Sequence, residues 1–168
     1  MKLVEELDYQ FDFEKLKKET PDILTNSLYC RFSGISIQHR PDIFPPWDQV
    51  DGLESLLLYK NYIEKDFSII NTKFKNTEFE KIIQDFNLVR SRLMILNLKS
   101  CYSIHQDPSW RLHIPIKTNF DCLFYYPDHN KHFHLEEGKI YKVNTTERHT
   151  FINAGQNVRS HFIGCLYN

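Results

Sequence analysis

The apolar residues of this chain follow one pattern up to Leu88 and another from there to the end. After Leu88 they form short runs rich in β-branched and aromatic residues, separated by turn-forming residues at a spacing of roughly 8–12 residues. Runs of this length and spacing are typical of antiparallel sandwiches and barrels. The second half is therefore predicted to be all-β, with the runs RLMILNLK, RLHIPIKT, DCLFYYP, KHFHLEE, GKIYKVN, RHTFIN and VRSHFIGCLY.

A helix is predicted over residues 76–89. Thr77 and Glu80 occupy the positions of a capping box, in which two side chains satisfy backbone N–H groups at the start of a helix. The apolar residues that follow recur at the spacing of one helix face. These residues are Phe79, Ile82, Ile83 and Phe86.

The other N-terminal segments carry weaker signals. A short amphipathic stretch ends before Pro21, because proline removes a backbone donor and restricts the preceding residue. Residues 28–37 alternate apolar and polar positions and predict a pair of strands broken near Gly34. Residues 39–52 contain three prolines and predict an irregular loop of the kind that often binds ligands, whereas 53–66 fit a helix or a strand. The amphipathic stretch has Leu7, Phe11, Phe13 and Leu16 on one side.

Together these segments predict a mainly β fold with flanking helices, in which a β-barrel or jelly roll forms the core of a single domain. Residues 92–168 would form the barrel, and residues 1–91 a helical and mixed part that packs on it. No internal repeat or low-complexity segment interrupts the 168 residues, a length that suits one domain.

The composition excludes several classes of protein. Lys and Arg number 21 against 22 for Asp and Glu, which argues against a nucleic-acid or anionic-membrane partner bound through bulk charge. The chain contains no run of eighteen apolar residues, so no membrane span is predicted. The four cysteines are scattered without a CxxC, as in a cytoplasmic protein with reduced thiols, and the opening MKLVEELDYQ turns acidic too early for a signal peptide.

Three residues form a candidate metal site. His105 and Asp107 are two residues apart, so in an extended segment both side chains point to the same face. His149 opens a later predicted strand. Two imidazoles and one carboxylate form the facial triad of non-haem Fe(II) oxygenases, which leaves metal positions open for a cosubstrate and O₂. His105, Asp107 and His149 are thus the predicted catalytic residues and iron ligands.

Arg159 adds to the specificity of this pattern. It lies ten residues after His149. If residues 149–154 and 158–167 form a hairpin, residue 151 faces Arg159 across the ladder and the guanidinium lies deeper in the barrel than His149. A buried arginine there requires an anion, because an unpaired buried charge is costly. A dicarboxylate such as 2-oxoglutarate, with one end on iron and the other on Arg159, meets that need.

The segments HQDPSWRLHIPI and LEEGKIYKVNTTERHTFINAGQNVRSHFIG resemble the aspartyl/asparaginyl β-hydroxylase family of 2-oxoglutarate-dependent oxygenases, and bacterial free-proline hydroxylases are similar in this region. The resemblance covers roughly residues 92–167, including the spacing from Gly138 to His149 and from His149 to Arg159. It implies a double-stranded β-helix of the jelly-roll, cupin-like kind, with Fe(II) and 2-oxoglutarate as cofactor and cosubstrate. The implied activity is hydroxylation of an unactivated C–H bond with O₂, releasing succinate and CO₂. The substrate would be an amino acid or a residue in a peptide or protein.

The resemblance also implies roles for individual residues. His105 and His149 match the iron ligands, and Arg159 matches the arginine that holds the far carboxylate of 2-oxoglutarate. Arg111 and His113 match an R-x-H pair that helps to bind the cosubstrate. Some members of the family have glycine in place of the carboxylate ligand, whereas this chain keeps Asp107, which favours a full triad and a hydroxylase.

Other histidines are assigned differently. His129, His132 and His134 resemble a second metal cluster, but their polar, turn-like surroundings favour a solvated loop. His132 or His134 could instead line the mouth of the barrel. His161 could face the interior, although a core histidine is the preferred interpretation.

Two alternatives to the hydroxylase remain open. One is a catalytically silent jelly-roll module that binds a small ligand; the presence of both Asp107 and Arg159 argues against it. The other is a cupin-like enzyme that uses a different metal.

Overall fold

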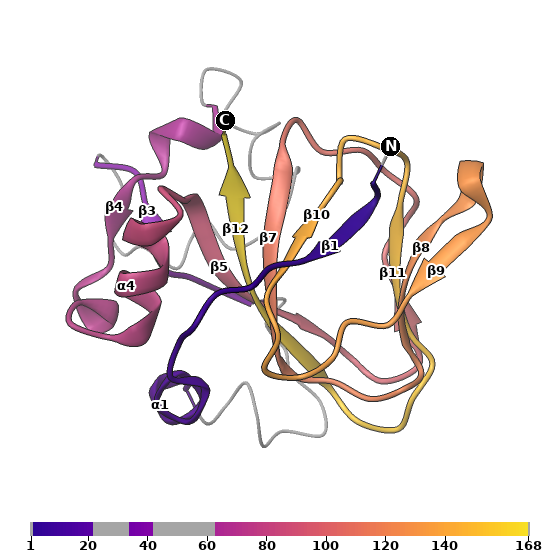
Figure 1. Ribbon diagram of the computed structural model, residues 1–168, viewed down its shortest axis with the longest axis horizontal. Helices are drawn as coiled ribbons and strands as arrows, with labels where there is room; N and C mark the ends of the chain where they lie inside the picture. The colour runs from indigo at the N-terminus through magenta and orange to yellow at the C-terminus, as the bar shows by residue number, and fades with distance from the viewer. Residues whose placement is uncertain (1, 22–33, 42–62, 168) are drawn as a thin grey trace.

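The structure is a computed structural model that describes residues 2–21, 34–41 and 63–167. Two antiparallel sheets form a sandwich, with both helices beside the larger sheet (Figure 1). In the larger sheet, the order is β1 (Val4–Glu6), β10 (Tyr141–Val143), β7 (Trp110–Lys117), β12 (Arg159–Leu166), β5 (Val89–Leu96) and β2 (Gly34–Ser36). In the smaller sheet, the order is β6 (Ser100–Cys101), β11 (Thr150–Asn153), β8 (Cys122–Tyr126) and β9 (Lys131–Phe133). The predicted mainly β fold, a two-sheet jelly roll with flanking helices, is confirmed.

The remaining elements lie outside the two main sheets. A small sheet pairs β3 (Gln38–His39) with β4 (Ile69–Ile70). The helices are α1 (Phe13–Glu19) and α4 (Glu78–Asp85), and the 3-10 turns are η2 (Glu64–Asp66), η3 (Thr72–Phe74) and η4 (Pro127–His129). Within the described ranges, no helix has the length and apolar character needed to cross a membrane.

The larger sheet is buried on both faces. Its outer face and the helices share one apolar cluster, to which α1 contributes Leu16 and α4 contributes Phe79. The strands contribute alternate residues to this cluster, such as Leu112, Ile114 and Ile116 of β7. The residues between them face the smaller sheet, because successive side chains of a strand point to opposite faces. On β7 these residues are Arg111 and His113, so polar groups line part of the interior.

The predicted helix of residues 76–89 is shorter in the structure. It begins as expected, because the Thr77 side chain accepts a hydrogen bond from the Glu80 backbone N–H. It ends at Asp85, and Asn87 adopts a left-handed conformation with φ of 48°. Such a residue stops a helix, and the chain then enters β5 at Val89, earlier than the boundary predicted at residue 92.

The predicted pairing of residues 149–154 with 158–167 is wrong. β11 pairs with β6 and β8 in the smaller sheet, whereas β12 pairs with β5 and β7 in the larger sheet. The turn between them therefore crosses from one sheet to the other, as connections in a jelly roll do. The short spacing of two strands does not distinguish a hairpin from such a crossing.

The N-terminal part contributes strands as well as helices. β1 and β2 form the two edges of the larger sheet, so this sheet extends across the predicted division at residue 92. The division itself stays a prediction. Of the strand pair predicted over 28–37, only residues 34–37 are described, and most of the loop 39–52 and of segment 53–66 lies outside the described residues.

Candidate metal and cosubstrate site

Backbone pairing brings the three predicted metal ligands together. His105 and His149 form an antiparallel bridge, with N–H to carbonyl distances of 3.0 and 2.9 Å in the two directions. Two residues further along, the Asp107 N–H donates to the Thr145 carbonyl at 2.8 Å. These backbone hydrogen bonds hold the short extended segment with His105 and Asp107 against the segment that carries His149.

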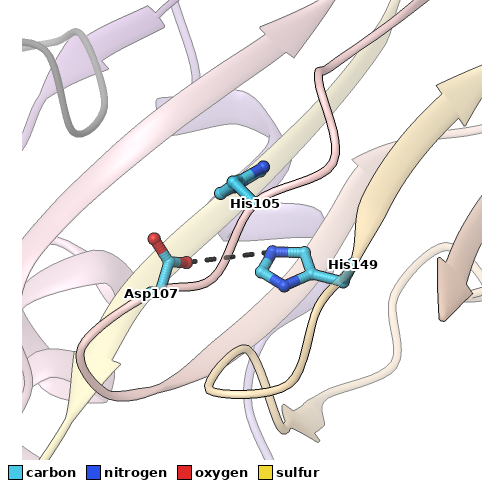
Figure 2. A group of neighbouring side chains, drawn as sticks. All are labelled: His105, Asp107 and His149. Atoms are coloured by element: carbon cyan, nitrogen blue, oxygen red, sulfur yellow. Dashed lines mark ion pairs between the residues drawn. The ribbon is translucent and has the colours of Figure 1, made fainter. Parts of the chain in front are cut away.

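One potential ligand atom from each of the three side chains lies within 4.8 Å of the others. Figure 2 shows the three side chains converging, with His149 Nε2 3.9 Å from Asp107 Oδ2. Within the described ranges, no other group of His, Cys, Asp and Glu is gathered in this way. The arrangement can hold one metal ion through two imidazoles and a carboxylate.

Hydrogen bonds at the Nδ1 atoms fix the orientation of the two histidine rings. His105 Nδ1 lies 2.7 Å from the Ser103 carbonyl oxygen, and His149 Nδ1 lies 2.9 Å from the Glu147 carbonyl oxygen. A carbonyl only accepts, so each Nδ1 carries the proton and each Nε2 presents a lone pair. Such hydrogen bonds set the tautomer and direction of metal-binding histidines.

His149 is held in the neutral form that binds a metal. Its ring stacks on Phe124 at a centroid distance of 5.0 Å and is buried. Burial lowers the pKa of His149, and the nearby imidazole of His105 acts in the same direction. Hydrogen bonding to the Glu147 carbonyl and the charge of Asp107 oppose the shift without reversing it.

A buried network holds the carboxylate of the site. Arg111 Nη2 lies 3.2 Å from Asp107 Oδ1, and the same guanidinium forms hydrogen bonds with Glu64 and Ser109. Glu64 also accepts from the Tyr167 hydroxyl at 2.7 Å. Burial alone would raise the pKa of Glu64, but the charge of Arg111 and the hydrogen bonds lower it to about 2. Arg111 is thus fully engaged with protein groups, and its expected contact with a cosubstrate stays a prediction.

Unlike Arg111, Arg159 has no hydrogen-bond partner among the described residues. The residue is about 1% exposed, and none of its Nε, Nη1 and Nη2 atoms donates to a group in that part of the chain. The guanidinium carbon lies 3.6 Å from the centroid of the Phe151 ring. The two residues therefore meet across the space between the sheets, not across the ladder that the sequence analysis predicted. Burial lowers the pKa of Arg159 to about 10, so the side chain remains a cation at neutral pH.

Two buried histidines share the interior with this arginine. His113 Nδ1 and His161 Nδ1 are 3.5 Å apart, and in the described part of the chain the Nε2 atom of each ring has no hydrogen-bond partner. Burial lowers the pKa of both rings well below the usual histidine value, and the charge of Arg159 lowers it further. Both rings are neutral at pH 7, and His161 faces the interior of the barrel.

The histidines set aside in the sequence analysis do not form a second cluster. His129 Nε2 lies 3.5 Å from Glu147 Oε2 at the surface, and His134 Nδ1 lies 3.0 Å from the Cys122 carbonyl oxygen. His132 is exposed on β9. The prediction of a solvated loop is therefore right about the exposure of His129 and His132 but wrong about the secondary structure, because these residues lie in η4 and β9.

Two buried residues of the interior were not predicted. Glu64 lies in a segment whose secondary structure could not be assigned from its pattern, so its burial had no signal in the sequence. Arg92 on β5 is about 5% exposed. The sequence did contain a signal for Arg92, because this basic residue is the first residue of the apolar run RLMILNLK.

No protein-family model matches the chain, and the curated proteins contain no match. Among solved structures, the chain is similar to a cupin domain from Bordetella pertussis Tohama I, with a TM-score of 0.42 and 14% identity, covering 47% of this chain and 81% of that one. It is also similar to an oxidoreductase of the 2OG-Fe(II) oxygenase family from Burkholderia pseudomallei, with a TM-score of 0.42 and 12% identity, covering 79% of this chain and 64% of that one. At this level of similarity, neither structure indicates a function for this chain.

Proposed function

We propose that the chain is an Fe(II)- and 2-oxoglutarate-dependent dioxygenase. It would hydroxylate an unactivated C–H of an amino acid, or of a residue in a peptide or protein, and release succinate and CO₂. The resemblance of residues 92–167 to the aspartyl/asparaginyl β-hydroxylase family supports the proposal, as does the chemistry of the buried side chains. Hydroxylation of this kind uses the oxidising chemistry that iron with 2-oxoglutarate and O₂ supplies when bound.

The observation that carries the proposal is the combination of a His-Asp-His cluster with a buried, unpartnered arginine inside the same barrel. The donor set suits Fe(II) because two imidazoles and one carboxylate leave metal positions free. The cost of burying Arg159 without a counter-charge indicates that an anion belongs beside it. A dicarboxylate explains both features, because one end can bind the metal while the other pairs with the guanidinium.

The polar residues predicted from the sequence are then proposed to have separate roles. His105, Asp107 and His149 would hold the iron, and Arg159 would bind the far carboxylate of 2-oxoglutarate. His113, with an unpartnered Nε2 in the same interior, is proposed to assist in cosubstrate binding. Arg111 keeps its predicted contact with the cosubstrate as a proposal, and it also orients the Asp107 carboxylate.

Anaerobic titration of the protein with Fe(II) and 2-oxoglutarate tests this assignment without requiring a substrate. We expect a weak metal-to-ligand charge-transfer band in the wild-type protein and its loss in His105→Ala and His149→Ala. Arg159→Met should keep iron binding but weaken 2-oxoglutarate binding by about 30-fold or more, the usual loss when a buried charge pair is broken. His132→Ala, on the exposed strand β9, is the matched control and should behave as wild type.

Absence of the band in the wild-type protein would contradict the proposal. If the band forms but no succinate appears with any substrate, the silent binding module is the better description. Retention of 2-oxoglutarate affinity in Arg159→Met would remove the arginine from the cosubstrate site.

A further inference from the structure

A second arginine, Arg92, lies on the inner face of the larger sheet. Arg92 of β5 is directly opposite Ile163 of β12, which is opposite His113 of β7. Directly opposed residues of antiparallel strands share a face, so Arg92 and His113 both face the interior. The residue is about 5% exposed, and its Nε and Nη1 atoms are buried without a hydrogen-bond partner among the residues that the structure describes.

The acidic groups near Arg92 are already engaged. Glu64 pairs with both Arg90, at 3.2 Å, and Arg111. Asp107 pairs with Arg111 and belongs to the metal cluster. Among the described residues, Arg92 therefore adds a positive charge to a region in which two cations, Arg90 and Arg111, already equal the two acids. A buried charge left in this state is costly unless an anion enters.

The cosubstrate does not supply that anion. Arg159 lies opposite Leu96 of β5, which is four residues along the strand from Arg92. Four residues of a β-strand span roughly 13 Å, so the two arginines define separate anion positions. The two carboxylates of 2-oxoglutarate are both used, one at the metal and the other at Arg159. Because the described residues offer no further carboxylate to Arg92, a third carboxylate is expected from another molecule.

Resting on the proposed function, the geometry points to Arg92 as the residue that binds a carboxylate of the substrate. The substrate is then a small free carboxylic acid, of which a free amino acid is the best fit to the proposed reaction. A guanidinium binds a carboxylate through two parallel hydrogen bonds, which orients the acid as well as holding it. Because Arg92 is about 5% exposed, the carboxylate must enter the interior, which a small molecule does more readily than the backbone of a folded protein.

The Fe(II) protein with 2-oxoglutarate is tested against a panel of free L-amino acids and short aliphatic monocarboxylic acids, each paired with its primary amide. Succinate formation measures turnover, and ligand-detected NMR measures binding of the same compounds without turnover. We expect at least one acid to bind and to stimulate succinate formation, and its amide to be weaker by about 30-fold or more, because only the acid offers the anion. This comparison requires no variant and is unaffected by folding defects.

Variants then assign the effect to Arg92. Arg92→Met, similar in length and uncharged, should weaken binding of the acid by about 30-fold or more and remove the preference over the amide. Arg92→Lys keeps the positive charge but cannot form the two parallel hydrogen bonds of a guanidinium. Its affinity for the acid should lie between those of the wild type and Arg92→Met. The affinity for 2-oxoglutarate, measured by the charge-transfer band, should stay within about twofold in both variants. Arg148→Met, which alters an exposed arginine paired with Asp128, is the control and should change neither affinity.

Different results would contradict the role of Arg92 and the proposed oxygenase function. If the charge-transfer band forms but no acid of the panel binds, or if the amides equal the acids, the assignment of Arg92 is overturned while the oxygenase stands. A loss of 2-oxoglutarate affinity in Arg92→Met would also overturn it, because Arg92 would then belong to the cosubstrate site. If no band forms in the wild-type protein, the proposed function itself fails.

Discussion

Two buried arginines of the interior differ in how their charges are compensated. Arg111 is held by Glu64, Ser109 and Asp107. Within the described ranges, Arg159 is instead placed against the face of Phe151, at 3.6 Å, without a hydrogen bond. A cation–π contact of a desolvated arginine contributes roughly 2 kcal/mol, whereas the cost of burying an ion is several kcal/mol. In the absence of a ligand, Arg159 is therefore a source of instability in the protein, and Arg111 is part of its framework.

This contrast predicts opposite effects of one type of substitution. Arg159→Met should raise the free energy of unfolding of the ligand-free protein by at least about 1 kcal/mol, because an uncompensated buried charge is removed. Arg111→Met should lower it by about 3–5 kcal/mol, because Glu64 loses its main counter-charge. Urea denaturation of both variants, in buffer without metal, measures the two values. Equal destabilisation by both variants would show that Arg159 has a partner in the protein.

At the scale of elements, the start of α4 was predicted more reliably than its end. Thr77 acts as the N-cap because its side-chain oxygen accepts from an N–H three residues ahead, an interaction that depends only on local spacing. The end at Asp85 depends on the left-handed Asn87, which lets the chain turn into β5. Local patterns do not reveal where a neighbouring strand has to begin.

The cap provides a test of α4 that does not involve the site. Thr77→Ala should lower the free energy of unfolding by about 1 kcal/mol, the usual cost of removing an N-cap oxygen. Thr77→Ser keeps that oxygen and should cost only a small part of this amount. Both variants should bind metal as wild type does, because α4 lies on the outer face of the larger sheet (Figure 1). A Thr77→Ala protein as stable as Thr77→Ser would show that the cap does not stabilise the helix.

Strand pairing was the weakest part of the sequence-based prediction. The runs themselves were identified, since alternation and turn residues are local features. The partner of β12 was not, because a hairpin and a crossing between sheets need similar turns. The contact between Arg159 and Phe151 was expected from the wrong pairing and arises instead from the packing of the two sheets. Likewise, Glu64 becomes an interior residue only through long-range side-chain contacts, such as that with Arg111, which no local pattern specifies.

At the scale of the whole molecule, the two sheets enclose a polar interior, not a purely apolar one. One part of the space between them is filled by Phe124, Tyr126 and Phe151. Beside it lie the metal cluster and the neutral imidazoles of His113 and His161. Such an interior favours ligand binding at the expense of stability, as is common for functional sites. Its response to pH follows from the two imidazoles.

The stability of the metal-free protein should decrease as the pH falls below about 6.5, where the histidines of an unfolded chain take up protons. His161 is held neutral in the folded state because burial, and then the charge of Arg159, lowers its pKa well below the usual value. The unfolded state therefore binds one more proton at this residue, and its contribution to stability is present above pH 6.5 and is lost as the pH falls. For one such residue the slope approaches about 1.4 kcal/mol per pH unit. The change of the free energy of unfolding with pH is measured by denaturation between pH 5 and 7. In His161→Gln this slope should be smaller by about that amount. In His132→Gln it should be unchanged, because His132 is exposed on β9. An unchanged slope in His161→Gln would mean that the imidazole takes up a proton within the folded barrel.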